Sequence, residues 1–158
     1  MTRPPPVRDR ISSVGVDYGY AVRAIETVRD ALKYMEIGIP IIHRGPRGEV
    51  HVDVPLMYHG YALDRIHYDP YVNTPSPKGR PVRARGVEVK EDHVREVMEK
   101  VLRELRVIDA VEFREPENAW IVPLAWNHII IAHIKVSYNG NELIPDYGLT
   151  EEVRRYAI

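Results

Sequence analysis

Cysteine and glutamine are both absent from this chain of 158 residues. The lack of cysteine excludes disulfides, thiolate nucleophiles and zinc sites with cysteine ligands. No apolar run approaches the roughly 18 residues of a membrane-spanning helix, and MTRPPPVRDR lacks the apolar region of a secretory signal. We therefore expect an intracellular, cytoplasmic protein without a membrane partner.

Other features of the composition are also typical of a thermostable protein. The chain has 17 arginines but five lysines, together with 13 prolines. Many charges, many prolines and few thermolabile side chains are typical of thermophilic proteins. The composition therefore predicts a hyperthermophilic source.

A strong charge of one sign is also missing, since 22 basic residues face 23 acidic ones. This balance excludes a generally polycationic coat for nucleic acid, so a charged partner must be bound by a local patch. The charge is unevenly spread, however. Residues 1–90 hold 14 cations and 10 anions, whereas residues 91–158 hold 8 cations and 13 anions.

Local catalytic motifs are not found in the sequence. GPRG and KGRPVRARG lack the spacing and the following helix of a phosphate-binding loop, and the serines lack a nucleophile elbow. The carboxylates show no metalloprotease or EF-hand pattern. We therefore expect a non-catalytic protein without a cofactor, although a site assembled from distant residues stays open.

Two apolar helical periods mark the helices. Residues 1–16 hold three consecutive prolines and three arginines, which predicts a mobile arm before a single globular domain over residues 17–158. A helical period begins at Tyr20 and ends before Gly38, and a second one covers residues 94–105. A short C-terminal helix should follow an N-cap at Thr150.

Period-two patterns mark the strands. IPIIHR and EVHVDV flank GPRG as a β-hairpin, and AWIVPLAW and HIIIAHIKVSY precede an Asn-Gly turn. Residues 58–88 hold four prolines and fit no period, which predicts a long loop. The fold class is then α+β, an antiparallel sheet of about five or six strands with two amphipathic helices packed on one face and a short C-terminal helix. A mainly α fold is the alternative, because residues 119–138 could form one buried helix broken at Pro123.

The expected long loop carries the most informative pattern. Residues 77–90 contain five cations and one anion, and four tyrosines precede them in MYHGYALDRIHYDPY. Guanidinium groups neutralise phosphates and tyrosine rings stack on bases, so we expect a nucleic-acid-binding protein that favours single strands. The expected phosphate contacts are Lys78, Arg80, Arg83 and Arg85, and the expected stacking rings are Tyr58, Tyr61, Tyr68 and Tyr71.

Seven histidines are many for this length, and four of them recur at an interval of eight. An even interval keeps strand residues on one face, so the first two could lie opposite each other across the GPRG hairpin. The interval also crosses a turn and a loop, and solvated histidines without metal are the simpler interpretation. The candidate metal ligands are His43, His51, His59 and His67.

We also expect a homo-oligomer, because the opposite charges of the two parts of the chain would suit head-to-tail contact between subunits. Two other functions stay open, and the first is a self-assembling structural or protein-binding component of the virion or nucleoprotein type. A small enzyme would need a pocket that joins histidines to a carboxylate, for example His133 near Lys135 with Asp146. The candidate histidines for such a pocket are His51, His59, His67, His93, His128 and His133.

Overall fold

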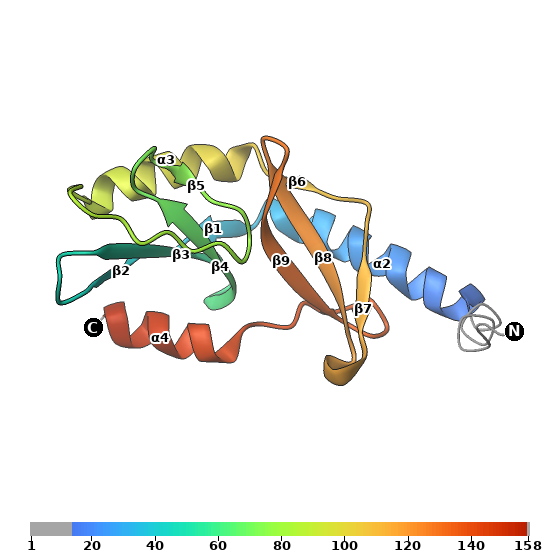
Figure 1. The fold of residues 1–158 in the computed structure, drawn as a ribbon. Coiled ribbons are helices and arrows are strands. Elements are labelled where there is room, and N and C mark those ends of the chain that lie inside the picture. Colours follow the sequence, from blue (N-terminus) through green and yellow to red (C-terminus); the bar gives the residue numbers. More distant parts are fainter. Residues whose placement is uncertain (1–13, 158) are drawn as a thin grey trace, which may run out of the picture.

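The computed structural model describes residues 14–157, in which three α-helices accompany two antiparallel sheets (Figure 1). Sheet A contains β1 (Met35–Ile37), β2 (Ile41–Arg44), β3 (Val50–Tyr58), β4 (Tyr61–Asp69) and β5 (Thr74–Pro75). Sheet B contains β6 (Arg106–Val107), β7 (Glu112–Arg114), β8 (Ala119–Trp126) and β9 (Ile129–Ser137). The helices are α2 (Val14–Leu32), α3 (Glu91–Arg103) and α4 (Tyr147–Ala157), with a 3-10 turn η1 (Glu115–Glu117).

The α+β fold class is confirmed, and the mainly α alternative is wrong. Residues 119–138 fold into β8, a tight turn and β9. The turn places Asn127 and His128 at positive φ, which an uninterrupted helix does not allow. Pro123 is tolerated within β8 because it lies in the gap between the β6 and β7 pairings, where its missing N–H removes no ladder bond.

Each sheet is built around one long central strand. In sheet A, β4 pairs with one edge of β3, while β1 and β2 share the other edge. In sheet B, β9 pairs with one edge of β8, while β6 and β7 share the other. Buried side chains from both sheets, such as Val52 and Ile134, belong to one apolar core.

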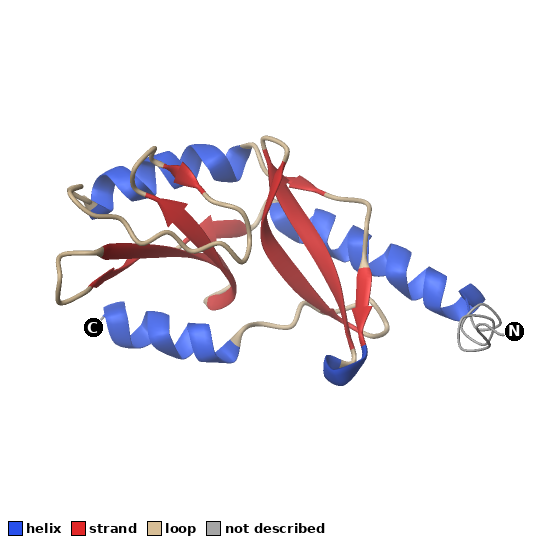
Figure 2. Ribbon diagram, viewed as in Figure 1, coloured by secondary structure: helices blue, strands red, loops and turns tan. Residues whose placement is uncertain are grey.

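The single sheet of five or six strands expected from the sequence is therefore replaced by two sheets, of five and four strands. Figure 2 shows one group of strands between α3 and α4 and the other beside α2. The two long helices accordingly contact different sheets: α2 contacts β8 and β9, and α3 contacts β1. Local periodicity does not report which strands pair, because strand pairing depends on contacts between distant residues.

The expected long loop over residues 58–88 is also wrong, since β4 and β5 occupy its first part. Ala62, Leu63 and Asp64 are buried in succession, so β4 is covered on both faces and shows no polar alternation there. What remains is residues 76–90, which we call the strap. Its Ala84 exchanges two backbone hydrogen bonds of 2.8 Å with Val50 of β3.

Both ends of the described chain differ from expectation. The first helix begins at Val14 rather than Tyr20, inside the expected arm, and residues 1–13 of that arm lie outside the described residues. The last helix begins at Tyr147, and the carboxylate of Asp146 accepts the N–H of Leu149 in the manner of an N-cap. Thr150 instead donates its hydroxyl to the Asp146 carbonyl. Within residues 14–157, no helix has the length and apolar character needed to cross a membrane.

The Asn139-Gly140 turn holds sheet B against α2, because Gly140 has φ +80° and its carbonyl accepts the Thr27 hydroxyl at 2.5 Å. A Cβ on Gly140 would lie 2.6 Å from the Tyr20 carbonyl oxygen. We expect Gly140→Ala to lower the unfolding free energy by about 3 kcal/mol or more, since it combines backbone strain with a clash. Gly60→Ala is the matched control, since Gly60 has φ +84° but open space around it.

Urea unfolding of both variants measures the difference. The control should lose about 1 kcal/mol, from the left-handed backbone alone. Equal losses in the two variants would contradict the role of the Gly140 contact with α2.

Candidate functional site

Strand alternation gives the hairpin end of sheet A one apolar and one polar face. Val50, Val52, Val54 and Leu56 of β3 are buried in the core. The residues between them point the other way, toward the face that α4 partly covers. The register then aligns His43 with His51, as the hairpin predicted, and Asp53 with His67. We use the name Asp53 cluster for His43, His51, Asp53, Arg65, His67 and Glu152.

Asp53 is the centre of this cluster and is only 1% exposed. Its Oδ1 lies 2.9 Å from Nδ1 of His67, and its Oδ2 accepts a hydrogen bond of 2.6 Å from Arg65. Burial by itself would raise the pKa of Asp53, but the hydrogen bonds from His67 and Arg65 outweigh it and lower the pKa to about 2. The carboxylate is therefore charged at neutral pH and is held by two groups from β4.

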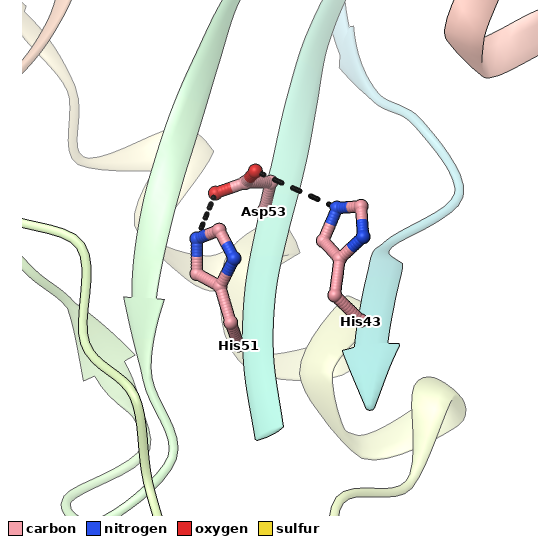
Figure 3. Close-up of side chains that lie close together, drawn as sticks. All are labelled: His43, His51 and Asp53. Atoms are coloured by element: carbon pink, nitrogen blue, oxygen red, sulfur yellow. Dashed lines mark ion pairs between the residues drawn. The ribbon is translucent and has the colours of Figure 1, made fainter. Parts of the chain in front are cut away.

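His43 approaches Asp53 from β2, on the side opposite β4, and His51 lies two residues before Asp53 on β3 itself. Their rings stack with centroids 5.3 Å apart, and both Nε2 atoms face the carboxylate (Figure 3). Nε2 of His51 lies 3.1 Å from Oδ1, yet it is buried and makes no hydrogen bond within the described part of the chain. Burial lowers the pKa of His51 although Asp53 opposes the shift, which favours the neutral ring.

Glu152 brings α4 into the cluster. Its Oε1 accepts a hydrogen bond of 2.9 Å from Arg65, and its Oε2 lies 3.7 Å from Nε2 of His43. The hydroxyl of Thr150, two residues before Glu152, accepts the backbone N–H of Ala62 in β4 at 2.9 Å. Helix α4 is thus fixed to the same strand that supplies Arg65, which sets the position of the Glu152 carboxylate.

Arginines border the cluster at the hairpin end of sheet A. Since Ala84 faces the core next to Val50, its neighbours Arg83 and Arg85 project toward the polar face. Nη2 of Arg85 lies 3.8 Å from Glu49. The backbone N–H of Arg47 is the main cause of the lowered pKa of Glu49, and the charges of Arg85 and Arg83 add to it.

The hairpin supplies two further arginines that sequence reasoning missed. Arg44 pairs with Val50 on one edge of β3, and Ala84 of the strap pairs with Val50 on the other edge. Strand β3 therefore separates Arg44 from the strap, and Arg44 lies on the face opposite to Arg83 and Arg85. Arg47 lies in the turn of the hairpin, and the side chains of Arg44 and Arg47 are both exposed. The excess of cations in this hairpin was visible in the sequence, but only strand pairing brings the hairpin and the strap to the same end of sheet A.

The structure separates the eight residues expected to contact nucleic acid. Arg80, Arg83 and Arg85 are exposed on the strap. Tyr71 is 54% exposed, and its hydroxyl accepts the backbone N–H of Arg85 at 2.8 Å. These four side chains remain available to a ligand.

Two of the remaining residues have structural contacts instead. Tyr68 is fully buried in the core, and its hydroxyl donates to Asn73. Burial raises the pKa of Tyr68 to about 12. Lys78 donates a hydrogen bond of 2.7 Å to Asp64, whose other oxygen accepts the backbone N–H of His133. Lys78 therefore ties the strap to both sheets.

Tyr58 and Tyr61 do not lie beside the arginines of the strap. They line a cavity of about 630 Å³ together with Tyr34. His59 lines this cavity too, in the turn after β3, so it does not join the other three candidate metal ligands. His128 is exposed in the turn before β9.

His133, Lys135 and Asp146 do line one cavity, of about 400 Å³. Burial lowers the pKa of His133, with Asp64 opposing the shift. However, the Asp146 carboxylate already caps α4 and Lys135 is 3.1 Å from Glu117. His93 lies on α3 beside Glu96 and takes part in neither cavity.

Comparison of the chain with protein-family models, with curated proteins and with solved structures found no match. The function is therefore argued from the geometry of the site alone.

The low pKa of Asp53 predicts an acid-dependent loss of stability. A carboxylate with a lowered pKa stabilises the fold above its unfolded value of 3.8, and this contribution is lost as the pH falls toward about 2. We expect Asp53→Asn to cost about 2 kcal/mol at neutral pH. The difference from the wild type should shrink between about pH 4 and pH 2.

Urea unfolding at several pH values checks this, with Asp30→Asn at an exposed position of α2 as the control. The control should follow the wild type at every pH. A cost of Asp53→Asn that stays constant down to pH 2 would show that charge is not the cause.

Proposed function

We propose that the protein binds nucleic acid through the arginines at the hairpin end of sheet A. The observation that carries the proposal is that two distant segments bring exposed arginines to the same end of sheet A, with Arg44 and Arg47 from the hairpin and Arg83 and Arg85 from the strap on the other side of β3. We call these four residues the arginine border. Exposed guanidinium groups bind phosphates through charge-assisted hydrogen bonds.

The charge of the border supports this proposal. Among residues 14–157, Arg85 faces the carboxylate of Glu49 at 3.8 Å, and this single ion pair leaves most of the four positive charges uncompensated. The whole chain has a formal net charge of −1, so this surplus is local. A local positive patch on a nearly neutral protein attracts a polyanion without binding polyanions over its whole surface.

One ring accompanies the border. Tyr71 is exposed, and the hydrogen bond from Arg85 fixes its hydroxyl end, so its face can receive a base at little entropic cost. Single strands expose base faces and duplexes do not. We therefore keep the preference for single strands and propose Tyr71, one of the four tyrosines expected from the sequence, as the stacking ring.

Fluorescence anisotropy of a labelled oligonucleotide across a salt series tests the proposal. The logarithm of the affinity should fall linearly with the logarithm of the salt concentration. Arg83→Ala with Arg85→Ala should weaken binding and reduce the slope by about 1.4 for a single strand. The matched control is Lys100→Ala with Arg103→Ala, at exposed positions of α3. No binding at low salt, or equal slope changes in both double variants, would overturn the proposal.

Lys78 gives a second check, because its role differs from that of its neighbours on the strap. Its ammonium group is paired with Asp64 rather than exposed. We expect Lys78→Ala to leave the salt slope within error of the wild type. The same variant should lower the melting temperature, because Asp64 loses its charged partner. A reduced slope in Lys78→Ala would show that this lysine contacts phosphate after all.

A further inference from the structure

We propose that His43, His51 and Asp53 bind a divalent transition-metal ion, with Glu152 as a fourth ligand. This site does not depend on the proposed nucleic-acid binding. One nitrogen from each histidine and one carboxylate oxygen of Asp53 lie within 4.8 Å of one another. Zinc bound at about 2.0–2.2 Å in a tetrahedral site has neighbouring donor atoms roughly 3.3–3.6 Å apart.

Most of this geometry is already present in the structure. Nε2 of His51 is 3.1 Å from Asp53, and Nε2 of His43 is 3.9 Å from Asp53 and 3.7 Å from Glu152. His43 is the ligand that has to move most, and its side chain is 46% exposed on β2. To close the site, the His43 ring must move toward Asp53 and Glu152.

The Nε2 atom of His51, which lacks a hydrogen bond, is the feature that most directly indicates an ion. It is buried and faces a carboxylate oxygen at 3.1 Å, but makes no hydrogen bond among the described residues. Buried polar atoms are nearly always satisfied, so an atom in this position needs an explanation. A cation held between the imidazole and the carboxylate would satisfy both groups at once.

Neighbouring groups hold the proposed ligands in place, as is usual around metal sites. His67 and Arg65 orient the carboxylate of Asp53, and Arg65 also holds Glu152 at 2.9 Å. The two carboxylates exceed the single guanidinium by one negative charge, which partly offsets a divalent ion. Two imidazoles with carboxylate oxygens select zinc, nickel, cobalt or copper over magnesium and calcium.

The first test is titration of chelator-treated full-length protein with Zn²⁺ and Ni²⁺ in a calorimeter. We expect one ion per chain. His43→Ala and His51→Ala should each weaken binding at least tenfold. His59→Ala and His93→Ala remove histidines outside the cluster and should bind like the wild type. Absence of binding, or equal binding by all four variants, would overturn the proposal.

Loss of folding could imitate loss of binding, so a second measurement uses the exposed ligand. His43→Ala should keep the melting temperature of the metal-free wild type, because the His43 side chain is 46% exposed on β2. Added Zn²⁺ should then raise the melting temperature of the wild type but not of this variant. With Co²⁺, the wild type should show the visible absorption of a site with nitrogen ligands, and His43→Ala should show a weakened band. An equal thermal shift in both proteins would count against the site.

Discussion

The negative charge of a buried carboxylate must be compensated by nearby groups. The groups that compensate Asp53 connect β3 with β4 and, through Arg65, with α4. Asp53 lies in the middle of β3, and its two oxygens face His67 and Arg65 of β4. Through Arg65 the same charge is linked to Glu152 of α4. A shift of β3 by one residue would turn Asp53 into the core and expose valines, so the register and the charge enforce each other.

The sequence predicted this face in part. The alternation of valines in β3 indicated which side of the hairpin is polar, and it placed His43 opposite His51. The pattern contained no sign of Arg65 or Glu152, because β4 is covered on both faces at one end and α4 arrives from the far end of the chain. Local periodicity therefore identified the histidines but not the groups that hold them.

The same limit explains the errors in the tyrosine set. Tyrosine is amphipathic, so its position in the sequence does not distinguish a core ring from an exposed one. Tyr68 follows His67 in a segment that the sequence predicted to be a loop, yet Tyr68 is fully buried. Lys78 was counted as a free cation because its partner, Asp64, belongs to a strand that the sequence did not reveal. In both cases a contact between distant segments decided the outcome.

The strap also covers a strand edge that could otherwise pair with another molecule. Strand β4 pairs with β3 only from Val52 onward, so the first residues of β3 would present free N–H and C=O groups along that edge. Such an edge is a template for adding a strand from another chain, and it promotes aggregation. Ala84 occupies the position by exchanging both hydrogen bonds with Val50. The strap thus protects the sheet from unwanted pairing at the place where its own arginines gather.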